Sequence, residues 1–481
     1  MNSTNIDNTA VRPNGVIKAK LSRDDIIMRG GMAVIALYLV ISLVFPLYAM
    51  FSKSFSTFQY DLSKFEVQVS DDAGQFSPAK ANLQSLNDEL QALSNAELST
   101  GSGGRLGVTV FFPDFSFRSP IMYRIRNVDQ QGRFLVGSTL VTGTDWQELD
   151  SNNFRRVQLR PVRSTGLSNF INYFSTPALF KSIQNSIFIS IISTIITVIL
   201  AFWFAYALNR SCMRFKGFFR LIAMAPILVP SLLPGIALVY LFGAQGVIKG
   251  LLFGASIYGP IGIIIGSVFF TFPHAFLIIS TALAISDARL YEAAVSLKAS
   301  AWKTFWTVTI PGARYGIVSA AFVVFNLVIT DFGLPKVIGG QFNVLAVDIY
   351  KQVIGQQNFE MGAVVSVVLI IPAILAFAID RFVQSKQVAL LTARSVPFHP
   401  KPSTKTDLTF TIYCGLVGFF IVGILGICQF AALIKFWPYD LSLSLNNYQF
   451  DKMDGGGWAA YYNSIKMALL TALIGTCVIF F

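Results

Sequence analysis

The residues whose types and spacing favour a specific contact lie between positions 287 and 314. Glu292-Ala293-Ala294 is followed by two small residues, Ala299 and Ala301, and by three aromatic residues, Trp302, Phe305 and Trp306. The pattern predicts a helix, a bend of small residues, a second amphipathic turn and a stop at Pro311. The alanines would let another protein approach closely, while Glu292 and Lys303 would fix the contact by charge. The aromatic cluster would lie at the membrane surface, where one face could anchor in a partner's groove.

Enzymatic chemistry has little support elsewhere in the chain. There are only two histidines, and His274 lies inside an apolar block. No GxxxxGKS or GxxxxGKT phosphate-binding loop occurs, so the chain is not by itself a P-loop ATPase. The cysteines lie in or beside apolar blocks, where they are expected to pack as small hydrophobic residues: Cys212, Cys414, Cys428 and Cys477. We therefore predict no catalytic residue, no metal site and no cofactor.

The elements that position the 287–314 segment are predicted to be membrane helices. Of the 481 residues, 54% are hydrophobic and 13% are charged, against about 25% charged in soluble domains. Uncharged stretches recur at lengths that suit a membrane-spanning helix of roughly 20 residues. The predicted spans are 29–52, 182–208, 218–243, 258–286, 315–335, 361–382, 408–436 and 463–481. The sequence therefore predicts an all-α polytopic membrane protein.

Basic residues predict which side of the membrane each loop occupies. Lys and Arg gather in the N-terminal tail (1–28), in 209–217, in 287–314 and in the linker 384–407. Cytoplasmic loops collect such residues, so the N-terminus is predicted to be cytoplasmic. The net charge of +12 then mostly reflects the inner-leaflet side, and nucleic acid is not needed to explain it.

Residues 53–180 form a polar insert that this topology puts on the outer face. We predict a small mixed α/β or β-rich domain with an amphipathic helix over 82–98, strands over 65–69 and 108–112, and a hairpin over 124–136. The insert would either help to dock a partner or be a passive structural addition.

One internal repeat indicates more than one helical unit. Asn185-Ser186-Ile187 opens the second span, and Asn463-Ser464-Ile465 opens the last. We expect a second unit to begin near residue 408 and to be cut off at the end of this sequence. The alternative is that any two apolar membrane helices look alike.

The 287–314 segment resembles the EAA loop of ABC-importer permeases. That pattern is E-A-A, three residues, Gly, nine residues and I-x-L-P. Glu292-Ala293-Ala294 fits, Val308, Ile310 and Pro311 fall in register, and Lys298 departs from the glycine. The resemblance implies a type I importer permease with a six-helix core over 181–383. It also implies that the loop docks on a separate dimer of ATP-binding subunits, which hydrolyses ATP, and that a periplasmic solute-binding protein and a second permease half or copy take part.

Two broken segments narrow the resemblance. Pro226–Gly235 and Thr330–Lys336, with Phe272-Pro273-His274, look like the fused double-length permeases for iron(III), thiamine and 2-aminoethylphosphonate. This implies a bacterial inner-membrane permease, with a phosphonate such as 2-aminoethylphosphonate as the first candidate solute and iron(III) or thiamine as alternatives. A stand-alone secondary transporter or a membrane-anchored sensor would leave the EAA-like loop or the many spans unexplained.

Five residues are candidates for the translocation path. Pro230 and Pro234 would break a helix that faces the path, or simply kink it. Asp331 is the clearest ionisable residue in a span, although a helix-end role or an ion pair at the outer mouth is favoured. His274 and Asn326 are polar residues within spans, where packing is the simpler role for the histidine.

Overall fold

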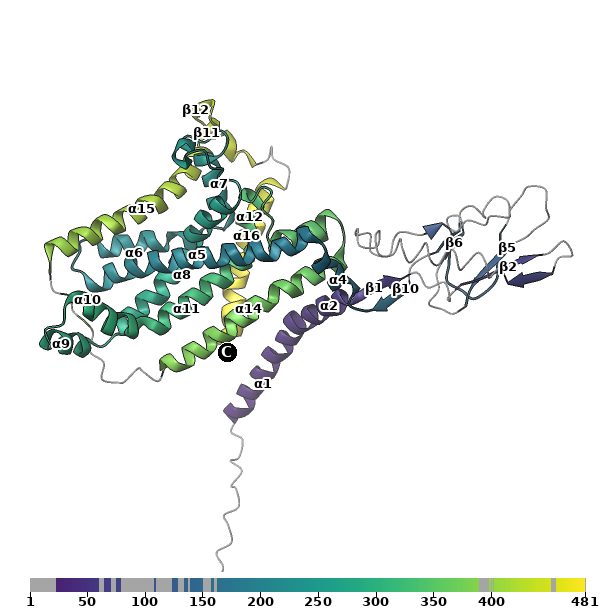
Figure 1. Ribbon diagram of the computed structural model, residues 1–481, viewed down its shortest axis with the longest axis horizontal. Coiled ribbons are helices and arrows are strands. Elements are labelled where there is room, and N and C mark those ends of the chain that lie inside the picture. The colour runs from purple at the N-terminus through teal and green to yellow at the C-terminus, as the bar shows by residue number, and fades with distance from the viewer. Residues whose placement is uncertain are drawn as a thin grey trace, which may run out of the picture. The chain divides into compact units, whose positions relative to one another are not determined.

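The computed structural model divides the chain into two compact units, Met50–Gln449 and a unit that combines Met1–Ala49 with Phe450–Phe481. Figure 1 shows the helices and strands of both units. The residues that the structure describes are 23–59, 65–70, 75–78, 108–109, 123–128, 134–136, 139–149, 157–159, 162–388, 398, 400, 402–450 and 456–480.

Long apolar helices dominate the described residues. Seven are long and apolar enough to cross a membrane, and an eighth span results if one bent pair of helices counts as a single span. The spans are Met28–Ser54, Pro177–Arg210, the pair Lys216–Leu228 and Leu232–Phe242, Pro260–Ile285, Ala301–Ile329, Phe359–Ser385, Thr404–Ala432 and Gly457–Phe480. The all-α polytopic fold predicted from the sequence is confirmed.

Helix α5 (Pro177–Arg210) is the central helix of the larger unit. It packs against α8 (Pro260–Ile285), α11 (Ile310–Ile329) and α15 (Thr404–Ala432). Its buried positions include a row of small hydroxyl residues: Ser182, Ser186, Ser190, Ser193, Thr194 and Thr197. Small residues let membrane helices approach closely and hydrogen-bond across the interface. The hydroxyl of Thr197 accordingly lies 3.2 Å from the hydroxyl of Thr271 on α8.

Glycine allows an equally close contact between α8 and α11. A Cβ atom added to Gly316 of α11 would lie 2.3 Å from the Cβ of Ala282 on α8. No larger side chain fits there without moving one helix away from the other.

The predicted break in the third span is confirmed. Helix α6 (Lys216–Met224) and the 3₁₀ turn η5 (Ala225–Leu228) meet α7 (Leu232–Phe242) at a bend of 103°. Pro230 lies between the two arms, where its missing N–H and fixed φ oppose a continuous helix. The short helix α12 (Gly333–Ile338) packs against α7 at Gly235, whose added Cβ would lie 3.1 Å from a Leu334 methyl group.

At the N-terminal end of α5, short elements join the bundle to the insert. Helix α4 (Ser168–Ser175) packs on α14 (Phe359–Val388), and α13 (Leu345–Tyr350) continues into the π-helical turn η8 (Lys351–Gly355). An ion pair between the Lys53 ammonium and the Glu360 carboxylate (3.0 Å) fixes the segment before the insert to the start of α14.

The described part of the insert is built from antiparallel strands. A two-stranded sheet pairs β1 (Ser56–Gln59) with β10 (Val162–Thr165). Two four-stranded sheets have the orders β3-β2-β5-β8 and β4-β9-β6-β7. Their strands are β2 (Phe65–Ser70), β3 (Phe76–Pro78), β4 (Val108–Thr109), β5 (Tyr123–Asn127), β6 (Phe134–Val136), β7 (Thr139–Val141), β8 (Gln147–Leu149) and β9 (Val157–Leu159).

Strands near residues 65 and 108 were predicted from the sequence and are present. The predicted hairpin over 124–136 is wrong, because β5 and β6 belong to different sheets. The predicted helix over 82–98 lies outside the described residues.

The remaining helices lie towards the chain ends. After α15 comes a hairpin of β11 (Ile434–Phe436) and β12 (Asp440–Leu443), followed by the turn η9 (Asn446–Tyr448). Near the N-terminus one run of helix consists of α1 (Arg23–Leu39), the π-helical turn η1 (Val40–Val44) and α2 (Phe45–Ser54). Near the C-terminus a second run consists of α16 (Gly457–Leu470), the π-helical turn η11 (Thr471–Gly475) and α17 (Thr476–Phe480). Whether residues 408–481 begin a second repeat stays a prediction.

Candidate functional site

The 287–314 loop folds into two short helices separated by a tight bend. Helix α9 (Ala288–Ser296) is capped by Asp287, whose carboxylate accepts the N–H of Arg289 at 3.1 Å. Helix α10 (Ala301–Thr304) is capped by Ser300, whose hydroxyl accepts the N–H of Lys303 at 3.2 Å. The predicted order of helix, bend and second turn is confirmed.

Lys298 adopts the backbone conformation that glycine would supply. Its φ is +53°, in the left-handed region. The N–H of Ala299 donates to the carbonyl of Ala294, and the N–H of Lys298 donates to that of Val295, each at 2.9 Å. These two bonds form a Schellman motif, which ends α9 with one left-handed residue. The bend therefore keeps its geometry although the sequence departs from the EAA pattern at Lys298.

Pro311 is not the helix stop that the sequence predicted. Helix α10 runs through the π-helical turn η7 (Phe305–Thr309) into α11, and Ala301–Ile329 forms one continuous span. Proline lacks an N–H and its ring crowds the carbonyl four residues earlier. The wider π-turn just before Pro311 is a known way to accommodate such a defect inside a helix.

The loop presents an apolar surface to its surroundings. Leu297 is 82% exposed, Trp302 68% and Val295 67%, with Glu292 and Ala293 exposed beside them. Exposed apolar residues gathered on one short element are typical of an interaction site. We call this patch, formed by Glu292, Ala293, Val295, Leu297 and Trp302, the docking surface.

Two residues expected at that surface are turned inward. Ala294 is buried, so it supports the packing of α9 instead of receiving a partner. Phe305 is also buried, although its ring still contacts the exposed Trp302 and Trp306, with centroids 5.8 Å and 5.4 Å away, so the predicted aromatic cluster is present. Of the other EAA positions, Ala299, Val308 and Ile310 are half-buried and Pro311 is exposed.

Aromatic and polar contacts tie the loop to the bundle. The Phe305 ring stacks on Trp203 of α5, with centroids 5.4 Å apart and planes 1° apart. The Tyr291 hydroxyl of α9 donates to the Thr309 hydroxyl at 3.1 Å, and the Tyr291 ring faces the Arg210 guanidinium at the end of α5. Sequence reasoning missed Arg210 and Tyr291, because an arginine after an apolar span is ordinarily a cytoplasmic loop residue.

The path candidates do not form one cluster. Asp331 lies two residues before α12, where its carboxylate accepts the Ser231 hydroxyl and the N–H groups of residues 332–334, and a helix-end role stays a prediction. Pro230 is exposed beside Ser231, whereas Pro234 is buried in α7. His274 lies on α8 and Asn326 on α11, and each buries one polar side-chain atom that has no hydrogen-bond partner in the described part of the chain.

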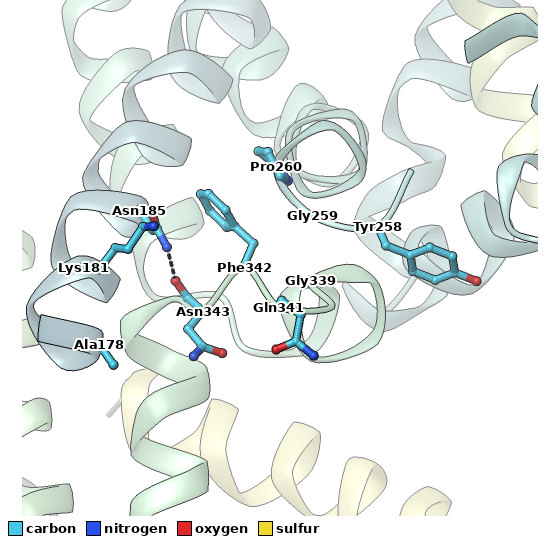
Figure 2. A pocket seen from close by; sticks show the side chains of 10 residues that line it. All are labelled: Ala178, Lys181, Asn185, Tyr258, Gly259, Pro260, Gly339, Gln341, Phe342 and Asn343. Carbon is cyan, nitrogen blue, oxygen red and sulfur yellow. Dashed lines mark hydrogen bonds between the residues drawn. The ribbon is translucent and has the colours of Figure 1, made fainter. Parts of the chain in front are cut away.

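A pocket of about 450 Å³ lies at the N-terminal end of α5, and Figure 2 shows the residues that line it. Its lining comes from the start of α5, the start of α8 and the connection between α12 and α13: Ala178, Lys181, Asn185, Tyr258, Gly259, Pro260, Gly339, Gln341, Phe342 and Asn343. The Asn185 amide donates to the Asn343 carbonyl at 2.8 Å, and the Lys351 ammonium donates to the Asn343 side-chain oxygen.

The charges around this pocket favour an anionic group. Lys181 lines it, and Lys351 contacts its lining. Burial raises the pKa of the neighbouring Asp348 carboxyl, against the opposing effects of Ser182 and Lys351. An ammonium, side-chain amides and the start of a long helix are donors that suit an oxyanion.

A bundle of long apolar helices with an exposed EAA-like loop resembles the inner-membrane permeases of ABC importers. Residues 197–388 match the family described as "Binding-protein-dependent transport system inner membrane component". Together with its long apolar helices, this match supports a multi-pass membrane protein.

Known relatives differ in the solute that they transport. The ferric transport system permease protein FbpB of Actinobacillus pleuropneumoniae is 25% identical over 62% of this chain and 46% of its own length. The molybdenum permease ModB of Azotobacter vinelandii is 28% identical over 34% of this chain and 75% of its own. The spermidine/putrescine permease PotB of Haemophilus influenzae is 24% identical over 51% of this chain and 87% of its own length. The chain spans about half the length of the ferric permeases that it matches.

Proposed function

We propose that this chain is the permease subunit of an ATP-driven importer, which passes a small solute from a separate binding protein across the bacterial inner membrane. The observation that carries the proposal is the docking surface. It is exposed and apolar, yet it belongs to a loop that is tied to α5 and α11 by Tyr291 and Phe305. An exposed element with such rigid support can receive a force from a partner and pass it to the helices.

The partner would be a dimer of ATP-binding subunits, with a second permease half or copy completing the pair of docking sites. Closure of the ATPase dimer would move α9 and α10. The stacked Phe305 and Trp203 rings and the Tyr291–Thr309 hydrogen bond would transmit that movement to α5 and α11. Access to the path would then alternate between the two sides of the membrane, as in other two-state helix rearrangements. ATP hydrolysis would belong to the partner, not to this chain.

The solute is proposed to be a small anion, with a phosphonate such as 2-aminoethylphosphonate as the first candidate. The lysines and amides around the pocket support an anion over a bare cation. The ferric relatives support iron(III) as the alternative, and thiamine is a further one. Uptake of labelled 2-aminoethylphosphonate in competition with iron(III) and thiamine would decide among them.

The orientation follows from the basic loops. With the N-terminus in the cytoplasm, the docking surface faces the cytoplasm and the insert and pocket face the outside, where a binding protein delivers the solute. Cysteine labelling of intact cells at Leu443 and at Leu297 would test this. A cysteine in place of Leu443 should react with an impermeant thiol reagent, and a cysteine in place of Leu297 should not.

The function is tested by expressing the chain with its ATPase and binding protein. The ATPase should co-purify with the unaltered chain, and Leu297→Asp should abolish both co-purification and uptake. The matched change Leu443→Asp, at an equally exposed leucine on β12, should leave the ATPase bound. Uptake that persists without any ATPase and collapses with the ion gradient would instead identify a secondary transporter.

A further inference from the structure

Arg210, the last residue of α5, lies at a junction between α9 and the linker that precedes α15. Its guanidinium carbon is 4.8 Å from the centre of the Tyr291 ring and 4.5 Å from the centre of the Phe398 ring. The two rings also contact each other, with centroids 4.7 Å apart. One planar cation therefore contacts an aromatic ring from each of two segments that are far apart in the sequence.

The bundle fixes Arg210 from the other side. One terminal nitrogen donates at 2.8 Å to the carbonyl of Leu283 in the last turn of α8, a carbonyl that also accepts the N–H of Ser286 at 3.4 Å. The preceding residue, Asn209, donates its amide to the hydroxyl of Ser280 at 3.0 Å. The Nε atom of Arg210 is buried and has no hydrogen-bond partner among the described residues. The guanidinium is thus held by α8 and by the two rings.

The linker is attached to the same end of α5 beyond Phe398. The Asp407 carboxylate, in the first turn of α15, accepts the N–H of Cys212 at 2.7 Å and the N–H of Ser403 at 3.3 Å. The Cys212 thiol lies 3.2 Å from the carbonyl of Pro400. Contacts at Phe398, Pro400 and Asp407 therefore connect the end of α5 to the start of α15.

We propose that Arg210 and Phe398 form a latch that positions α9 and passes its displacement through the linker to α15. The significance of a moving α9 rests on the proposed function, but the latch itself is a property of this chain. Arg210 is a positioning residue, because it acts through Tyr291 and Phe398. Helix α15 opens the segment that the sequence predicts to begin a second permease repeat. The latch would therefore pass the movement of α9 from the first repeat to the start of the second.

The latch is tested by hydrogen exchange on the full chain in lipid nanodiscs. Phe398→Ala and Arg210→Gln should each speed the exchange of α9 amides by about tenfold, the size expected for losing a desolvated cation–π contact. The double variant should be faster by less than the product of the two single effects, because both substitutions remove the shared contact between Arg210 and Phe398. Phe419→Ala, at an exposed phenylalanine of α15, and Arg220→Gln, at an exposed arginine of α6, are matched controls that should leave α9 unchanged.

A second measurement separates transmission from simple support. With the ATPase bound, ATP should alter exchange both in α9 and in the first turn of α15. In Phe398→Ala, ATP should still alter the exchange of α9 but should no longer alter that of α15. Phe398→Tyr should restore the ATP-dependent change in α15. Unchanged α9 exchange in both single variants, additive effects in the double variant, or an α15 response that survives Phe398→Ala would overturn the latch. Failure of the unaltered chain to bind an ATPase would overturn the proposed function instead, while the nanodisc result would still decide the latch.

Discussion

The left-handed conformation of Lys298 makes the bend of the docking loop open to a quantitative test. The bend requires φ near +53°, which a residue with a Cβ atom adopts at a cost of about 1–2 kcal/mol. Lys298→Gly removes that strain but adds freedom to the unfolded chain worth about 0.4–1 kcal/mol. The net effect is expected to be a bend that is equally stable or more stable by up to about 1.6 kcal/mol.

Lys298→Val has the opposite effect. A β-branched side chain is a genuine outlier at this φ, so the variant should weaken the bend by about 1.4 kcal/mol or more, a factor of about ten in the local opening equilibrium. The readout is the exchange rate of the Ala299 amide, which donates to the Ala294 carbonyl only while the bend is formed. Its exchange should be about tenfold faster in Lys298→Val and unchanged or slower in Lys298→Gly.

Association with the ATPase gives a second readout of the same change. Lys298→Gly should retain the ATPase, and Lys298→Val should lose most of it, because Leu297 and Trp302 would no longer share one surface. If the valine variant kept both its slow exchange and its ATPase, or if the glycine variant lost them, the left-handed bend would not be what shapes the docking surface.

Three further changes test other parts of the account. Glu292→Arg should abolish uptake while the protein still reaches the membrane, and uptake that survives with normal ATPase binding would argue against a coupling role. Gly316→Val should lower the melting temperature sharply, since overpacking costs about 1–3 kcal/mol, whereas Gly423→Val on α15, with open space around it, should not. Thr197→Val should lower the free energy of unfolding by only about 0.6 kcal/mol, as is usual for a hydrogen bond between membrane helices. A loss above about 2 kcal/mol would show that more than one contact depends on Thr197.

The membrane architecture was largely predictable because the bilayer imposes it. A helix must satisfy its own backbone groups in lipid, so uncharged stretches of sufficient length identify the spans. The break near Pro230 was predictable for the same kind of local reason. Pro311 shows the limit of such reasoning. A proline can be absorbed by a π-turn, and whether it stops a helix depends on the packing on either side.

The site was predictable in its pattern but not in its orientation. The spacing of Glu292, Lys298 and Pro311 located the loop, yet which side chains face outward depends on contacts with α5. Ala294 and Phe305 are inward for that reason, although their residue types suit a surface equally well. Likewise, no local pattern announces that Arg210 meets Phe398, since the two are brought together only by the packing of α5 beside the linker.

The most direct test of the central claim is site-specific photo-crosslinking from position 297 in membranes that contain the assembled transporter. A photoreactive residue in place of Leu297, 82% exposed on the docking surface, should crosslink to an ATP-binding subunit, and the yield should change when ATP is added. The same residue in place of Leu443, 75% exposed on β12, should not. Crosslinks from position 297 to lipid alone, or equal crosslinking of the ATPase from both positions, would contradict the assignment of this loop as the contact with the ATPase.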